Sequence, residues 1–213
     1  MAIVDLLKSR LKRKYLYYRN ILKNSCIGGG KFSLLWSLRH IHIYATDYRL
    51  IIKTKYLRDV DIWMYGNGHQ LIIEEGVVYK SGSIWFEDNN CQITIGKNTT
   101  IEEAHLAAAE DNMRLSIGEE CMLSQGINIT TTDSHSIISI SSKERINKAA
   151  DVTIGKHVWI GRNVAINKGV LAGDNSVIAG HSVVTKEVPQ NTIVAGTPAK
   201  VVKSDITWDR NRL

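Results

Sequence analysis

Histidine is the side chain best suited to move a proton near neutral pH, because its ordinary pKa lies near 6.5. The chain has seven histidines, namely His40, His42, His69, His105, His135, His157 and His181. His157 and His181 occupy turn positions of a repeat described below and are expected to be solvated corners. His105 takes a repeat position that suits a small residue, so it is either a core residue or a group that lines a pocket. His135 stands apart, in Thr132-Asp133-Ser134-His135, where the repeat is interrupted.

The elements that must hold these side chains follow a six-residue repeat. From residue 154 onward an aliphatic or small residue recurs at every sixth position, as Ile154, Ile160, Ile166, Ala172, Ile178 and Val184. A Val or Ser stands four residues after each of them, and Gly or polar pairs fill the remaining positions. This spacing fits neither the period of a helix nor the alternation of an ordinary strand. It predicts short strands with one large inward side chain, joined by two-residue turns.

A longer, 22-residue period runs through the first half of the chain. It relates Gln70-Leu71-Ile72-Ile73, Gln92-Ile93-Thr94-Ile95 and Arg114-Leu115-Ser116-Ile117. We interpret this period as three hexads plus four residues at one corner, with coils that begin near Ile51, Ile73, Ile95, Ile117, Ile154 and Ala172. The fourth interval is much longer than the others, so its extra residues are expected to form a loop within 130–151. The pattern predicts an all-β solenoid of about six coils, with parallel strands stacked about 4.8 Å apart.

Three segments follow from the repeat. Residues 49–188 are expected to form the solenoid, and residues 189–213 its C-terminal cap, because the ends of a solenoid must be covered. Residues 1–48 are expected to form an N-terminal basic helix and a connection. Within them, Val4, Leu7 and Leu11 recur at helical steps, which predicts an amphipathic helix over 2–23.

The net charge of +6 belongs to that N-terminal segment. Residues 1–23 contain seven basic side chains and one acidic side chain, whereas basic and acidic groups balance in the rest of the chain. The balance argues against a nucleic-acid partner. A hydrophobic content of 44% excludes a disordered chain, and no apolar run approaches the length of a membrane span. We expect the basic helix to cap the first coil, with some attraction to anionic lipid or to an acidic glycan.

Three motifs carry a family resemblance. They are Ile154-Gly155-Lys156-His157-Val158-Trp159-Ile160-Gly161, Val183-Val184-Thr185-Lys186-Glu187-Val188-Pro189 and Ala195-Gly196-Thr197-Pro198-Ala199-Lys200. With them, the chain resembles the hexapeptide-repeat acyltransferases, and among these the O-acetyltransferases of sugars and polysaccharides. The resemblance covers about residues 70–203. It implies a left-handed parallel β-helix, a homotrimer with active sites between adjacent subunits, and acetyl-CoA as co-substrate.

The resemblance also implies the reacting group. His135 matches the histidine that removes the proton from an acceptor hydroxyl. Asp133 could orient the imidazole or the acceptor, and Glu144 is an equal candidate for orienting the base. Glu102 matches a position beside the acceptor, but the family often has an amide side chain there, which leaves the acceptor contacts open.

The acyl donor is expected to bind elsewhere on the coils. By resemblance, Trp159 lies near the thioester or the pantetheine arm, or packs at a subunit contact. Backbone amides at Gly161, Arg162 and Gly180 are expected to contact the pantetheine and stabilise the oxyanion. The resemblance places a further group near the nucleotide phosphates, namely Thr185, Lys186, Lys200 and Lys203.

No metal is expected. A zinc site like that of the β-helix carbonic anhydrases needs three histidines, two of them about five residues apart, and the sequence lacks that spacing outside 40–42. Cys26, Cys91 and Cys121 are odd in number and share no metal-type spacing, which indicates reduced, buried thiols.

The sequence therefore predicts an acetyl-CoA-dependent O-acetyltransferase that acts on a hydroxyl of a sugar or a bacterial surface polysaccharide. We expect it in the cytoplasm, with peripheral contact to the inner face of the membrane through residues 1–23. One alternative is N-acetylation of an amino sugar, and another is a non-catalytic β-helix scaffold that binds a partner.

Overall fold

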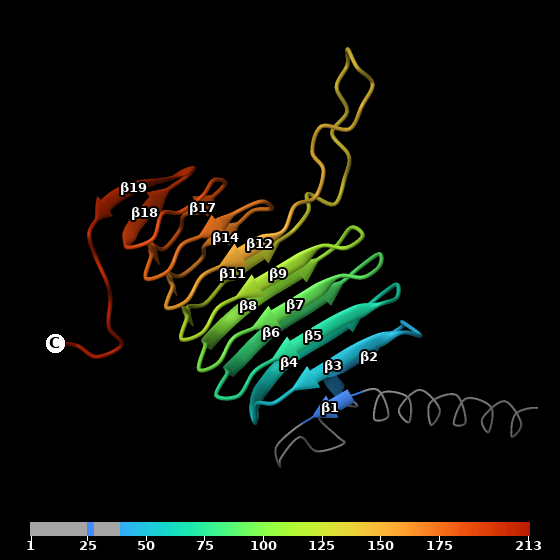
Figure 1. Ribbon diagram of the computed structural model, residues 1–213, viewed down its shortest axis with the longest axis horizontal. Helices are drawn as coiled ribbons and strands as arrows, with labels where there is room; N and C mark the ends of the chain where they lie inside the picture. The colour runs from blue at the N-terminus through green and yellow to red at the C-terminus, as the bar shows by residue number, and fades with distance from the viewer. Residues whose placement is uncertain (1–24, 28–38) are drawn as a thin grey trace, which may run out of the picture.

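The computed structural model describes residues 25–27, by their backbone alone, and residues 39–213 in full. These residues wind into an all-β solenoid of about seven turns (Figure 1). One side is a seven-stranded parallel sheet made of β1 (Ser25–Ile27), β3 (Tyr48–Ile52), β5 (His69–Ile73), β7 (Gln92–Ile95), β9 (Arg114–Ile117), β12 (Val152–Ile154) and β15 (Leu171–Ala172). We call it the first sheet.

The other two sides share a second sheet. Its nine-residue strands bend around a corner, so each covers both sides; they are β4 (Tyr56–Met64), β6 (Val78–Phe86) and β8 (Thr100–Ala108). Beyond β8 each turn has two short strands instead. One set is β10 (Met122–Leu123), β13 (Trp159–Ile160), β16 (Val177–Ile178) and β18 (Thr192–Gly196), which define the β10 side. The other set is β11 (Ile127–Thr130), β14 (Ala165–Ile166) and β17 (Val183–Val184). Together with β2 (Ile41–Ile43) and the C-terminal ends of β4, β6 and β8, this set forms the side that we call the β11 side.

The bend in β6 depends on a glycine. Gly82 has a φ of +130°, and a Cβ atom there would lie 1.8 Å from the carbonyl oxygen of Ala104 on the neighbouring strand. Only glycine allows both this conformation and this approach of the two backbones.

The interior consists of stacked aliphatic side chains. The six residues that the hexad pattern places inward from Ile154 to Val184 are all at most 1% exposed. β-Branched residues suit these short strands because their stiff side chains pack well against the rungs above and below. Each fully buried Ile or Val contributes about 1.5–3 kcal/mol relative to an exposed one. Since every rung packs only against its neighbours, the core is one continuous column.

The number of coils and the start of one coil differ from the expectation. The solenoid has about seven turns rather than six, because Ser25–Ile27 pairs in parallel with Leu50–Ile52 and adds a rung. That rung lies further before its partner than one repeat, so the sequence period does not extend to it. In the next turn Ile52, not Ile51, pairs with Ile73, because that interval is one residue shorter than the repeat.

The C-terminal end folds back on the solenoid. β18 pairs antiparallel with β19 (Ala199–Ser204), and the tail then runs back beside the coils (Figure 1). The Trp208 indole donates a hydrogen bond of 2.7 Å to the carbonyl of His157, and Arg210 donates one of 2.9 Å to the carbonyl of Cys121. The predicted helix over 2–23 lies outside the described residues.

Candidate active site

His135 lies in a loop that interrupts the solenoid at one corner. Residues 131–151 connect β11 to β12 and protrude from the body (Figure 1). The same corner carries only short turns in the preceding coils, so the extra residues of the long interval are concentrated here. The His135 side chain is exposed, and its imidazole makes no hydrogen bond to any residue of 39–213. It is therefore open to an incoming molecule.

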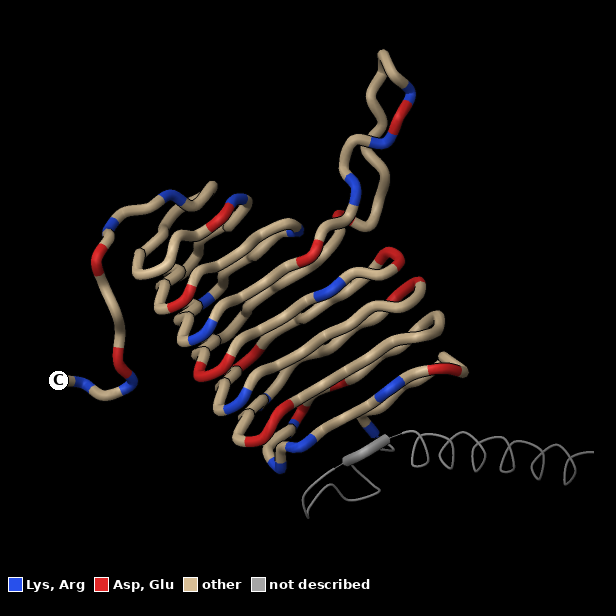
Figure 2. The backbone as a smooth tube through the Cα atoms, in the orientation of Figure 1, with Lys and Arg blue, Asp and Glu red and all other residues tan. Residues whose placement is uncertain are grey.

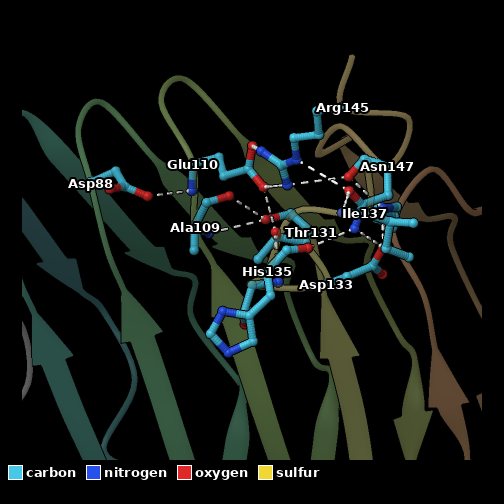
Figure 3. A network of polar contacts seen from close by, with 12 residues as sticks. Asp88, Ala109, Glu110, Thr131, Asp133, His135, Ile137, Arg145 and Asn147 are labelled. Carbon is cyan, nitrogen blue, oxygen red and sulfur yellow. Dashed lines mark hydrogen bonds and ion pairs between the residues drawn. The ribbon is translucent and has the colours of Figure 1, made fainter. Parts of the chain in front are cut away.

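Asn147 fixes the backbone around His135. Its side chain is 8% exposed, and its Nδ2 donates to the carbonyl of His135 at 2.8 Å and to Asp133 Oδ2 at 2.9 Å. Its Oδ1 accepts a hydrogen bond of 2.7 Å from the amide of Ile137. In Figure 3 the imidazole of His135 points away from this network. The loop thus holds the histidine through its main chain and leaves the ring free.

Asp133 does not face the imidazole. Its carboxylate forms an ion pair with Lys168 and accepts the hydrogen bond from Asn147. Lys168, followed by Asn147, holds the pKa of Asp133 below its usual range. Lys168 also donates to the carbonyl of Asn147 at 2.8 Å. The structure therefore gives Asp133 a place in the support of the loop, and Glu144 is likewise exposed without a side-chain hydrogen bond to His135.

A second ion pair ties the loop to the preceding turn. Arg145 binds Glu110 with two hydrogen bonds, of 2.7 Å and 2.5 Å, and Thr132 donates a third of 2.6 Å to the same carboxylate. Arg145 is the main reason that the pKa of Glu110 lies below its usual range. Figure 2 shows acidic residues at the turn tips next to this loop and both basic and acidic residues within the loop. The opposite charges anchor the protruding segment to the solenoid.

The acceptor candidates lie on the coils before the loop. Glu102 is exposed at the bend of β8 and forms an ion pair of 2.6 Å with Lys80. His105 is half-buried on the outer face, where its Nδ1 lies 2.7 Å from Ser83 Oγ, and burial lowers its pKa. His105 is thus a surface group beside a hydroxyl rather than a core residue.

The donor candidates lie on another side of the molecule. Trp159 is 38% exposed on β13, and its ring centroid lies 6.1 Å from that of Trp208. The amide of Gly161 is already used, because it donates to the carbonyl of Ile178 at 2.8 Å. The amides of Arg162 and Gly180 make no hydrogen bond within the described part of the chain. These two amides are the better candidates to meet a developing negative charge.

The residues expected near nucleotide phosphates line the C-terminal end. All four are exposed, and none of their three lysines forms an ion pair with a described residue; they are Thr185, Lys186, Lys200 and Lys203. Lys200 and Lys203 lie on β19, opposite Ala195 and Ile193 of β18. Their charges are available to an anionic ligand.

The remaining histidines and cysteines have structural positions. His181 is exposed at a turn, as expected, but His157 is not simply solvated, because its ring stacks on Trp208 at 4.1 Å. His69 is 1% exposed and its Nδ1 accepts the amide hydrogen of Cys91. Burial raises the pKa of both Cys91 and Cys121 to about 11, so these thiols stay protonated. The described residues contain no cluster of three potential metal ligands.

A solved structure decides the family. A polysialic-acid-specific acetyltransferase, NeuO, superposes with a TM-score of 0.73 and 33% sequence identity, covering 80% of this chain and 78% of that chain. The chain belongs to the hexapeptide-repeat β-helix acetyltransferases. No protein-family model matches it.

Two further relatives match smaller parts of the chain. The polysialic acid O-acetyltransferase of Escherichia coli O1:K1 / APEC is 41% identical over 91 residues, which are 43% of this chain and 30% of that protein. A galactoside acetyltransferase solved in complex with coenzyme A has a TM-score of 0.50 and 29% identity, covering 63% of this chain and 64% of that chain. The chain thus spans less than a third of this first curated relative's length in the matched stretch.

The sequence pattern of this hexapeptide-repeat acetyltransferase did not indicate several residues that stabilise the His135 loop. Glu110, Arg145, Asn147 and Lys168 support the His135 loop, but they lie in turns and in the loop, where the six-residue period gives no signal.

No helix in the described residues is long and apolar enough to cross a membrane.

Proposed function

We propose that this chain transfers acetyl from acetyl-CoA to a sugar hydroxyl of a polysaccharide, with His135 as general base. The observation that carries the proposal is the open imidazole of His135, whose backbone is hydrogen-bonded within its loop, in a member of this acetyltransferase family. NeuO is a polysialic-acid-specific acetyltransferase, so polysialic acid is the first acceptor to test.

The reaction needs two proton transfers, one from the acceptor hydroxyl and one to the leaving thiolate. The imidazole of His135 removes the proton from the acceptor hydroxyl as its oxygen attacks the thioester carbonyl carbon. The carbonyl oxygen then carries a negative charge, which the amides of Arg162 and Gly180 would stabilise. As the C–S bond breaks, the protonated imidazole returns the proton to the leaving thiolate. The products are an acetyl ester and free CoA.

The donor is proposed to lie along the β10 side. Trp159 would contact the pantetheine arm. Gly161 beside it lets two coils pack closely, since a Cβ atom there would lie 2.5 Å from the amide nitrogen of Gly180. The exposed cations Lys186, Lys200 and Lys203 would offset the phosphates of CoA, with Thr185 beside them.

The site is proposed to be shared between subunits of a homotrimer. His135 follows β11, whereas Trp159 lies on β13, and these strands belong to different sides of the coil. A second subunit would bring a β10 side against a His135 loop. Glu102 is proposed to contact the acceptor, and Asp133 to position the loop. Left-handed winding and a basic N-terminal helix remain part of this proposal.

The test is product analysis. The purified chain is incubated with acetyl-CoA and either polysialic acid or a galactoside. The mass of the product is measured by mass spectrometry before and after treatment with mild alkali. We expect one added acetyl group per modified sugar, removed by alkali because esters are labile and amides are not. Addition that survives alkali would show N-acetylation, and no addition to any glycan would refute the proposal.

A further inference from the structure

A band of aromatic rings lies on the β11 side, in the turns that precede the His135 loop. It comprises His42, Tyr44, Trp63, Tyr65 and Trp85, and we call it the aromatic band. The His42 ring stacks on Trp63 with centroids 3.9 Å apart, and Tyr44 stacks on Tyr65 at 4.9 Å. Trp85 lies 5.0 Å from Tyr65 at an interplanar angle of 43°. Five aromatic side chains thus form one ordered surface across three turns.

The band is accessible and rigid. Tyr44 is 63% exposed, and the other four rings are half-buried. Because each ring is held by a neighbour, little side-chain freedom remains to be lost when a ligand binds. Such a surface favours a ligand with flat apolar patches, since C–H bonds with a partial positive charge are attracted to the negative face of an aromatic ring.

The band lies in line with the His135 loop. Trp63, Trp85, Ala107 and Thr130 are successive partners in the strand register, and Thr130 is the last residue of β11 before the loop. Four strand spacings separate β2 from β11, so the band and the loop together span on the order of 20 Å. A molecule that reaches from the imidazole to Tyr44 must therefore be longer than one sugar.

A row of polar side chains runs beside the band. Asp61, Ser83, His105 and Asn128 are successive partners on the same strands and are half-buried or exposed. The row supplies carboxylate, hydroxyl, imidazole and amide groups next to the rings. A sugar presents the same combination, an apolar C–H face and a rim of hydroxyl groups. The core of a contact between two protein subunits would instead be depleted of carboxylates such as that of Asp61.

We propose that the aromatic band binds the part of the acceptor polysaccharide that extends from the sugar at His135. The rings of Trp63, Tyr65 and Trp85 stack against successive sugar units, and the polar row hydrogen-bonds their hydroxyls. This inference rests on the proposed function, and it adds that the acceptor is bound as a chain of several sugars. Stacking is insensitive to ionic strength, so this part of the binding persists at high salt.

The test compares acceptors of different length. Trp63→Ala and Tyr44→Ala are assayed with short and long chains of polysialic acid and with short and long galactosides. Tyr56→Ala is the control, because Tyr56 is an equally exposed aromatic residue, at 62%, at the other end of β4. We expect kcat/KM for long chains to fall about tenfold in Trp63→Ala, by loss of one stacked ring, with the short-chain rate unchanged. Trp63→Phe should restore most of the loss.

Four results would overturn the inference. Equal effects on short and long acceptors would show that the band does not read chain length. A smaller oligomer in Trp63→Ala and Tyr44→Ala, measured by light scattering, would show that a second copy covers the band. Tryptophan fluorescence of the wild type that stays unchanged when any glycan chain is added would exclude binding at the aromatic band. This measurement does not depend on acetyl transfer. A wild-type enzyme that transfers acetyl while the variants behave normally leaves the proposed function intact and removes only this inference.

Discussion

His135 is supported through its main chain rather than through a carboxylate on its ring. The side chain of Asn147 binds the carbonyl of His135, the carboxylate of Asp133 and the amide of Ile137 at once. Asp133 in turn is neutralised by Lys168. A triad in which an acid orients the imidazole does not describe this arrangement. The loop holds the main chain of His135 and leaves its imidazole without a hydrogen bond to the described residues.

Asn147→Ala should impair catalysis without weakening donor binding. It removes four hydrogen bonds and leaves the part-buried amide of Ile137 and carbonyl of His135 without these partners, at a cost of about 1–3 kcal/mol for each unsatisfied group. We expect kcat to fall by about tenfold or more, while KM for acetyl-CoA stays within about twofold. Steady-state kinetics at saturating acceptor measure both values. An increase in KM for acetyl-CoA with normal kcat would contradict the positioning role.

Glu110 should contribute to stability in a pH-dependent way. Arg145 lowers its pKa in the folded chain, so its contribution is present above the ordinary carboxyl pKa and is lost as the pH falls through the lower folded value. Glu110→Gln should therefore lower the melting temperature at pH 7, and the difference from wild type should shrink below about pH 4. Melting curves between pH 7 and 3 test this. A difference that stays constant over that range would show that the ion pair does not contribute.

At the scale of elements, the hexad pattern predicted which residues of the rungs point inward, but it did not predict the polar contacts at the corners. Ile154, Ile160 and Ile166 point inward as predicted because each hexad must bury one aliphatic side chain. The rung of Ser25–Ile27 had no such signal, since its interval to β3 departs from the repeat period. Of the site, the sequence indicated His135 through a family likeness. It did not indicate Asn147 or Arg145, because a polar contact across a loop follows no period.

The bent strands should be sensitive at their corner. Gly82→Ala places a methyl group against the carbonyl of Ala104 and forces an alanine into a φ of +130°, so one of the two strands must move. We expect a loss of about 2–4 kcal/mol in the free energy of unfolding. Urea unfolding followed by circular dichroism measures it. Thr94→Ala, at a half-buried position in the first sheet, serves as a control that should cost well under half as much.

At the scale of the molecule, the residues proposed for proton transfer and those proposed for donor binding lie on different sides of one chain. His135 follows the β11 side, whereas Trp159 and the amides of Arg162 and Gly180 belong to the β10 side and its turns. A shared site predicts complementation between two inactive variants. His135→Asn and Trp159→Ala, unfolded together and refolded at equal concentration, should recover up to about a quarter of the wild-type rate by random assembly. Recovery no greater than the sum of the separate variants would place the whole site within one subunit.

The central claim is that the imidazole of His135 is the base for acetyl transfer. The most direct measurement is the rate of thiol release from acetyl-CoA with a competent acceptor, for wild type, His135→Asn and His181→Asn. His181 is the matched control, since it is an exposed turn histidine with a φ of +61°, a conformation that asparagine also tolerates. We predict a loss of about 10²–10⁴-fold in His135→Asn and a wild-type rate in His181→Asn, with the oligomer unchanged in both. A wild-type rate in His135→Asn would contradict the assignment.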